Sequence, residues 1–282
     1  MTVILNSIDL QKSIIHDLLK DISKIKTVPK LRIILVGNDP ASMTYTANKK
    51  KFCEKINARC EILKLDSDVK EAPFLASIKE SINDSSVHGC LIQLPLPKHL
   101  AHINLGNLLS PEKDVDGFHP SNIQMLYNGD IGDNCLLPCT PKGIVSLLKH
   151  YQITLPRKKI TIIGRSIIVG RPLSLLLTNY DATVTLCHSK SQNIKQLTKA
   201  SDIIITAIGI PNFLNEEFLN SRKDQVLIDV GINQYKGNLC GDIDFLSVQD
   251  KVAAITPVPK AVGPMTIASL GQNLLQATKK CL

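Results

Sequence analysis

An aromatic hydroxyl and an amine stand four positions apart, at Tyr45 and Lys49, just after an apolar run and a turn. The segment predicts a helix over about 42–57, with Ser42 or Asp39 as its N-cap. Residues four apart share one face of a helix, so both side chains would point to the same side near its start. The helix N-terminus and partial burial favour an uncharged amine, which can act as a base or proton shuttle. Taken alone, the pattern also fits a solvated, lysine-rich face.

Two polar groups farther along the chain could complete such a site. Gln93 interrupts the apolar run 89–97 shortly before two prolines, where a parallel strand would end. A buried amide needs a partner, so Gln93 would bond either to nearby backbone or to the Lys49 amine or a ligand carbonyl. In a later loop, Asp114 and Asp116 could form an acid pair, but no histidine cluster completes a metal site. A single carboxylate that accepts paired N–H donors from a heterocycle suits this loop better.

The second half of the chain carries a glycine turn of the dinucleotide-binding kind. A predicted buried strand, 159–164, ends at Gly164 and is followed by Arg165, Ser166 and, later, Gly170. A turn of this kind aims the N-terminus of the next helix at a pyrophosphate. The spacing departs from the usual pattern, because Ser166 takes the place of the second glycine and the last glycine comes one residue late.

Residues at the ends of later strands indicate which dinucleotide would bind. The predicted strand 182–187 leads into Ser189 and Lys190, where the adenosine ribose should lie. An NAD site usually has an acidic residue there, whereas hydroxyl and cationic groups, together with Arg165, suit the 2′-phosphate of NADP. Ile232 follows another strand beside a glycine that would let the backbone approach the nicotinamide.

Apolar strands alternate with amphipathic helices around these groups. The predicted strands are 31–36, 60–65, 89–97, 159–164, 182–187, 202–209, 225–233 and 252–256. Helices are predicted at 7–26, 42–57, 71–83, 100–109 and 141–151, in a segment ending near 179, and at 265–280. This alternation indicates an α/β protein with parallel sheets, in which catalytic groups gather at the carboxyl ends of the strands.

The composition disfavours several other classes of protein. The 282 residues are 44% hydrophobic and 21% charged, and no apolar run or signal-peptide pattern suggests a membrane or secretory segment. Eight scattered cysteines show no metal-binding spacing and suit reduced thiols in the cytoplasm. The net charge is +8, but the basic residues do not alternate with aromatic ones as they do on nucleic-acid-binding surfaces. The charge therefore favours the binding of anionic small molecules. We therefore expect a cytoplasmic enzyme with no membrane, nucleic-acid or metal partner.

Seven motifs follow one another over nearly the whole chain, and together they resemble those of the bifunctional methylenetetrahydrofolate dehydrogenase/methenyltetrahydrofolate cyclohydrolase family. They are Tyr45-x-x-x-Lys49, Gln93-Leu-Pro-Leu-Pro97, Lys113-Asp-Val-Asp-Gly117, Pro138-Cys-Thr-Pro141, Gly164-Arg-Ser-x-x-Val-Gly-Arg-Pro172, Asp229-Val-Gly-Ile-Asn233 and Thr256-Pro-Val-Pro…Val262-Gly-Pro-Met-Thr266. The resemblance implies NADP-dependent oxidation of 5,10-methylenetetrahydrofolate to the methenyl form, followed by hydrolysis to 10-formyltetrahydrofolate. Both reactions belong to one-carbon metabolism and serve purine biosynthesis.

The resemblance also implies a role for each matching position. Lys49 is similar to the family's general acid/base, and Gln93 to the residue that hydrogen-bonds it. Tyr45 is similar to the residue that stacks on the folate, and Asp116 to the carboxylate that binds the pterin ring. Cofactor contacts are implied at Gly164, Arg165, Ser166, Ser189 and Ile232, and further substrate contacts at Pro259 and Gly263.

The fold implied by the resemblance is two α/β domains flanking a cleft, the second a Rossmann-like NADP-binding domain. Residues 1–140 would form the folate-binding catalytic domain, completed by a C-terminal helix, 264–282, that packs back on it. Residues 141–263 would bind NADP. The expected ligands are one-carbon derivatives of tetrahydrofolate, with or without a polyglutamate tail, and the expected assembly is a homodimer formed through the cofactor domain.

One departure from the family pattern is Lys260-Ala261, where two glycines are usual. Side chains there could narrow the folate cleft or weaken one activity, or Lys260 could attract a polyglutamate tail. Three alternatives to a bifunctional enzyme are a non-catalytic dinucleotide-binding regulator, a monofunctional NAD-dependent dehydrogenase and a quinate or shikimate dehydrogenase. The amine–amide pair disfavours the first, the absence of an acidic residue near Ser189 the second, and the placement of the lysine the third.

Overall fold

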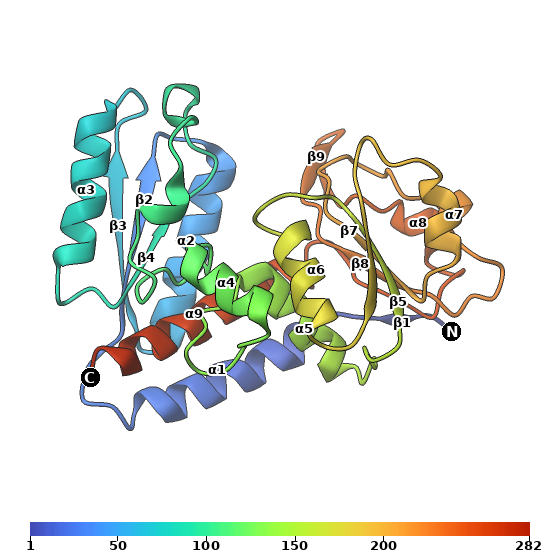
Figure 1. The fold of residues 1–282 in the computed structure, drawn as a ribbon, viewed down its shortest axis with the longest axis horizontal. Coiled ribbons are helices and arrows are strands. Elements are labelled where there is room, and N and C mark those ends of the chain that lie inside the picture. Colours follow the sequence, from blue (N-terminus) through green and yellow to red (C-terminus); the bar gives the residue numbers. More distant parts are fainter. The chain divides into compact units, whose positions relative to one another are not determined.

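The computed structural model describes all 282 residues, and the chain forms two compact units (Figure 1). The three-stranded unit comprises Ser13–Cys139 and Ile267–Leu282, and the six-stranded unit comprises Met1–Lys12 and Thr140–Thr266. The C-terminal part of helix α9 (Val262–Lys280) thus belongs with the N-terminal unit, as predicted. None of the helices combines the length and hydropathy that crossing a lipid bilayer requires.

The first twelve residues differ from the predicted domain of residues 1–140, because they belong to the six-stranded unit. Val3 and Ile4 form a short strand, β1, that pairs in parallel with Ala254 and Ile255 of β11. Two residues that add an edge strand to a sheet formed some 250 positions later leave no local pattern in the sequence. The division therefore follows backbone pairing rather than chain order.

The three-stranded unit is a parallel sheet in the order β3-β2-β4, with helices on both faces. Its main elements are α1 (Ile8–Ile22), β2 (Lys30–Val36), α2 (Pro40–Lys55), β3 (Arg59–Leu65), α3 (Glu71–Asn83) and β4 (Gly89–Ile92). Ile34 and Val36 face α3, where they pack in one cluster with Phe74 and Ile78. Figure 1 shows α2 on the opposite side of this sheet from α3.

Helix α9 packs against α2 and approaches it closely at Gly271. A Cβ atom on Gly271 would lie 2.6 Å from the ring of Phe52 on α2 and 3.2 Å from Leu18 on α1. Only glycine leaves room for this contact, since distances below 3.0 Å force a neighbour to move. The C-terminal helix thus fixes the position of α2.

Two features of the segment after β4 differ from the prediction. The predicted helix 100–109 is replaced by two single turns of 3₁₀-helix, η1 (Lys98–Leu100) and η2 (Leu105–Asn107). The side chain of Asn104 accepts the N–H of Gly106 and so begins the second turn instead of continuing a helix. An unpredicted helix, α4 (Pro120–Asn128), follows, with the His119 ring accepting the N–H of Ser121 at its N-terminus.

The six-stranded unit is a parallel sheet in the order β1-β11-β8-β7-β5-β6. The other strands are β5 (Lys159–Ile163), β6 (Thr183–Cys187), β7 (Ile203–Thr206), β8 (Val226–Asp229) and β11 (Ala254–Ile255). The helices are α5 (Cys139–His150), α6 (Gly170–Thr178), α7 (Ile194–Lys199) and α8 (Phe245–Val248), with 3₁₀ turn η3 (Glu216–Phe218). A separate hairpin joins β9 (Asn233–Tyr235) to β10 (Asn238–Cys240).

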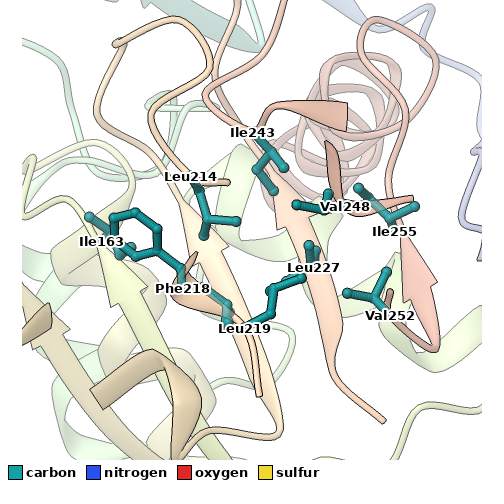
Figure 2. Packing of buried hydrophobic residues seen from close by; sticks show 10 residues of the cluster. Ile163, Leu214, Phe218, Leu219, Leu227, Ile243, Val248, Val252 and Ile255 are labelled. Carbon is teal, nitrogen blue, oxygen red and sulfur yellow. The ribbon is translucent and has the colours of Figure 1, made fainter. Parts of the chain in front are cut away.

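One hydrophobic cluster fixes the centre of this sheet (Figure 2). Leu227 of β8 is fully buried among side chains of the neighbouring strands and of the loops that cover them. The buried members are Ile163, Ile204, Leu214, Phe218, Leu219, Leu227, Ile243, Val248, Val252 and Ile255. The chain crosses from β6 to β7 on the other side of β5, so the order of the strands reverses beside β5, where α/β proteins bind ligands.

Candidate active site

The Lys49 amine is buried and paired with one side chain. Only 6% of Lys49 is exposed, and its Nζ donates a hydrogen bond of 3.0 Å to Oε1 of Gln93. Helix α2 is started by Asp39, whose carboxylate accepts the N–H of Ser42 at 2.8 Å, with Pro40 in the first turn. The sequence predicted either Ser42 or Asp39 as the N-cap of this helix, and in the structure the N-cap is Asp39. Lys49 thus lies on a capped helix rather than on a solvated face.

Gln93 meets both of the bonding possibilities that the sequence left open. Its backbone N–H donates to Ile34 O at 2.9 Å, so it continues β4 beside β2 at the carboxyl edge of the sheet. Its Nε2 donates to Leu94 O at 2.8 Å, while Oε1 accepts from Lys49. Because the amide is held on both sides, its oxygen is fixed toward the amine, and the amine is held in turn.

Tyr45 lies one helical turn before Lys49 and is half-buried. Burial raises the pKa of its hydroxyl above the ordinary value of tyrosine, so the ring carries a neutral hydroxyl at physiological pH. A neutral, partly accessible aromatic ring beside a buried amine is suited to holding a flat heterocycle.

The two aspartates of the 113–117 segment differ in burial and in hydrogen bonding. Asp114 is buried, and its carboxylate accepts the backbone N–H of His119. Asp116 is partly exposed, and its carboxylate has no partner within the chain. An isolated parallel bridge pairs Asp114 with Cys90 of β4, and Asp116 follows two residues later in the chain. Asp116 is thus the carboxylate of this segment that remains available to a ligand.

Burial, together with the nearby charge of Asp116, raises the pKa of Asp114 to about 6, although backbone N–H groups oppose this. The folded protein therefore binds this proton more tightly than the unfolded chain, and the resulting stabilisation is present below about pH 4 and lost as the pH rises through about 6. Between pH 4.5 and 7, Asp114→Asn should remove about 2 kcal/mol of this pH dependence from the free energy of unfolding.

Urea denaturation of both proteins across this pH range measures the difference. The exposed Asp130→Asn change in the same unit is the matched control and should leave the pH dependence as in the wild type. Equal pH dependence in the wild type and Asp114→Asn would contradict the raised pKa.

The glycine turn of the six-stranded unit is closely packed and leads into the N-terminus of α6. Gly164 follows β5 with φ of +126°, and a Cβ there would lie 2.2 Å from Ala207 O after β7. A Cβ on Gly170, at the start of α6, would lie 1.8 Å from Gly164 O. Both positions therefore require glycine, and the departure from the usual spacing still forms a tight turn that ends at a helix N-terminus.

The other predicted cofactor positions lie around this turn or at neighbouring strand ends of the same unit. Arg165 and Ser166 are exposed in the turn, and Ser166 Oγ accepts the N–H of Val169 at 3.1 Å. Ser189 is exposed just after β6, the neighbour of β5. Ile232, which is 41% exposed, follows β8. No carboxylate side chain occurs in 164–171 or 187–191.

Pro259 and Gly263 lie apart in the sequence from the lysine site and belong to the six-stranded unit. Pro259 O accepts the N–H of Ala261, and Lys260 O accepts that of Ser7. Ala261 is fully buried, whereas Lys260 is exposed, so the two residues that replace the family's glycines face different surroundings.

Two family models match this chain, with the descriptions tetrahydrofolate dehydrogenase/cyclohydrolase, catalytic domain, over residues 5–116, and NAD(P)-binding domain, over residues 138–282. The bifunctional protein FolD of Aquifex aeolicus is 44% identical over 284 residues, which cover 99% of this chain and 96% of that protein. The chain belongs to the tetrahydrofolate dehydrogenase/cyclohydrolase family. Membership confirms the resemblance drawn from the motifs and excludes a quinate or shikimate dehydrogenase.

Solved structures of this family have the same fold as the present chain. The crystal structure of the bifunctional enzyme FolD from Campylobacter jejuni is 39% identical, covers 100% of both chains and superposes with a TM-score of 0.93. The Trypanosoma brucei enzyme, complexed with NADP cofactor and an inhibitor, is 28% identical, with a TM-score of 0.92 over 99% of this chain and 98% of that one. The predicted α/β architecture and its NAD(P)-binding unit are confirmed.

Proposed function

We propose that this protein is a bifunctional enzyme that oxidises 5,10-methylenetetrahydrofolate with NADP and hydrolyses the methenyl product to 10-formyltetrahydrofolate. The observation that carries the proposal is the buried amine of Lys49, held by Gln93 at the carboxyl edge of the sheet. A protein that only bound nucleotide would not need this pair. Relatives of full length named bifunctional FolD support the same conclusion.

The six-stranded unit is suited to NADP. Gly164 and Gly170 pack so closely against neighbouring backbone that a Cβ on either would clash, and the turn that they form ends at the N-terminus of α6, where backbone N–H groups would meet a pyrophosphate. Arg165 and Ser189, with no acidic side chain nearby, suit a 2′-phosphate, and Ile232 gives an apolar surface for the nicotinamide. When bound, NADP⁺ accepts the hydride that leaves the one-carbon bridge of the folate.

The three-stranded unit would hold the folate and move the proton. Tyr45 would stack on the folate and keep its reactive carbon in one plane, and Asp116 would accept N–H groups of the pterin ring. In the hydrolysis, water attacks the methenyl carbon, and the Nζ of Lys49 takes the proton that the water loses. Opening of the five-membered ring then transfers a proton to the departing nitrogen, and one proton is released to solvent overall.

Gln93 would keep the Lys49 amine aimed at the reacting carbon, so its loss should slow the hydrolysis less than the loss of the amine. A hydrogen bond to a charged group contributes about 1.5–3 kcal/mol, and Gln93→Leu should therefore lower cyclohydrolase kcat/KM by about 10- to 100-fold. Gln124→Leu, on the exposed face of α4, is the matched control. Unchanged hydrolysis in Gln93→Leu would remove Gln93 from the mechanism.

Further proposals concern the setting of the enzyme. We assign folate binding to the three-stranded unit and NADP binding to the six-stranded unit, with Pro259 and Gly263 as substrate contacts. The eight cysteines are all free thiols, which supports a reducing, cytoplasmic location. A homodimer and folate substrates with or without a polyglutamate tail complete the proposal, and where a tail is present the exposed Lys260 would attract it.

The test is an absorbance time course with methylenetetrahydrofolate and either NADP or NAD, followed at wavelengths for the reduced nucleotide and for the methenyl intermediate. Reduction of NADP with formation and decay of the methenyl species is the expected result. Nucleotide reduction without decay would contradict the hydrolase activity, and a preference for NAD would contradict the assignment of Arg165 and Ser189. Absence of both reactions would contradict the proposed function.

A further inference from the structure

The carboxylate of Asp242 is the acceptor for four donors from two different loops. Asp242 is fully buried. Its Oδ2 accepts the N–H groups of Ile208 at 2.7 Å and Gly209 at 3.2 Å. Its Oδ1 accepts the N–H of Ile210 at 3.0 Å and the side-chain Nδ2 of Asn233 at 2.9 Å. Three successive backbone N–H groups and one amide thus converge on a single side chain.

The two loops begin at the carboxyl ends of adjacent strands. Residues 207–210 follow β7 and residues 230–233 follow β8, and these strands pair in parallel beside the glycine turn of β5. Ligands of such sheets bind outside these strand ends. Each loop exposes an isoleucine there, Ile210 at 49% and Ile232 at 41% exposure. Two exposed isoleucines on loops that a buried carboxylate fixes in place indicate a surface that contacts a ligand.

Asp242 is itself fixed by a second buried carboxylate, that of Asp229 at the end of β8. Asp229 Oδ1 accepts the backbone N–H of Asp242 at 2.9 Å and that of Gly231 at 3.0 Å, and Oδ2 accepts Ile243 N–H at 2.9 Å. A Cβ on Gly231 would lie 2.2 Å from Asp242 Oδ1, so this loop passes directly over the carboxylate. The arrangement ties the 230–233 loop to the sheet through both aspartates.

We propose that Asp242 is a positioning residue for the dinucleotide: its carboxylate joins the loops after β7 and β8 and so sets the apolar wall, Ile210 and Ile232, against which the nicotinamide lies. Asp242 touches no ligand itself, because it is covered completely by these loops. The inference rests on the proposed function for the identity of the ligand. It adds a residue that acts on cofactor binding through the backbone of two loops.

The first experiment is Asp242→Asn in the full-length protein, with NADPH binding followed by its fluorescence. The amide keeps the shape of the side chain but turns N–H groups toward N–H donors, so at least one loop must move. The dissociation constant for NADPH should rise by about 10- to 100-fold, in line with the loss of one or two buried acceptors. Hydrolysis of added methenyltetrahydrofolate should stay within about twofold of wild type, since general acid–base groups lie in the other unit.

Asp244→Asn is the matched control, because Asp244 lies two residues away and only caps α8, where asparagine serves equally well. Asn233→Ala removes one donor and leaves Asp242 in place, and it decides the question if Asp242→Asn fails to fold. Weaker NADPH binding in either folded variant, with hydrolysis retained, is the expected outcome. Wild-type affinity, or an equal loss of binding and hydrolysis, would overturn the proposal. Because binding is measured directly, absence of folate turnover in the wild type would count against the proposed function alone.

Discussion

Replacing Lys49 by methionine is expected to lower cyclohydrolase kcat by about 100- to 10,000-fold, the range that a positioned general acid or base contributes. Lys49 is only 6% exposed, and methionine is an unbranched side chain that fits the same buried position. Methionine cannot take a proton from water. Stopped-flow decay of methenyltetrahydrofolate measures the hydrolysis without any nucleotide. NADPH affinity should be unchanged, because Lys49 and the glycine turn belong to different units.

Lys50 provides the matched control for this change. It is the next residue on α2 and is exposed, so Lys50→Met removes the same charge from the surface and leaves the amine of Lys49 in place. Lys50→Met should keep full hydrolysis. An equal loss in both variants would mean that net positive charge, and not a placed amine, supports the reaction.

Gly170→Val is expected to abolish tight nucleotide binding, with an NADPH dissociation constant raised by about 10- to 100-fold from overpacking of the turn. Its Cβ would lie 1.8 Å from Gly164 O and 3.1 Å from the Cα of Arg165, so the turn has to open. Dehydrogenase activity should fall with the affinity. Hydrolysis of added methenyltetrahydrofolate should persist, because Lys49 and Gln93 lie in the three-stranded unit.

The control for the glycine change is Gly132→Val. A Cβ on Gly132 meets nothing within 4 Å, so this substitution shows the effect on NADPH binding of a glycine-to-valine change that causes no clash. NADPH affinity should be that of the wild type. Normal NADPH binding by Gly170→Val would show that the dinucleotide binds elsewhere on the protein.

Most strands of the two parallel sheets were predictable because they are short and largely apolar, whereas β1 and the hairpin strands β9 and β10 were not predicted. The site could be foreseen because Lys49 and Gln93 follow two of the predicted strands. Periodicity was less informative at 100–109. Leu100 and Leu109 are buried and Leu105 packs against the same cluster, as a helix would require, yet the backbone forms two separate turns. The pattern of apolar residues therefore reports which side chains are buried and not which backbone hydrogen bonds form.

Other features could not be predicted because their partners are distant in sequence. Nothing local distinguishes Asp114 from Asp116, and only the fold shows that one serves backbone N–H groups while the other stays available. Asp242 likewise meets donors some thirty residues earlier in the chain, at 208–210. Helix α4 was missed because its cap is the ring of His119, a residue rarely used for that purpose.

The most direct test of the central claim is the pH dependence of the isolated hydrolysis in Lys49→Arg. Arginine keeps the positive charge and much of the side-chain volume, but its guanidinium does not give up a proton in proteins. If Lys49 moves the proton, Lys49→Arg should retain about 1% or less of wild-type hydrolysis across the pH range. Near-normal hydrolysis by Lys49→Arg would contradict the proton-transfer role of Lys49. The side chain would then contribute only its positive charge to the reaction.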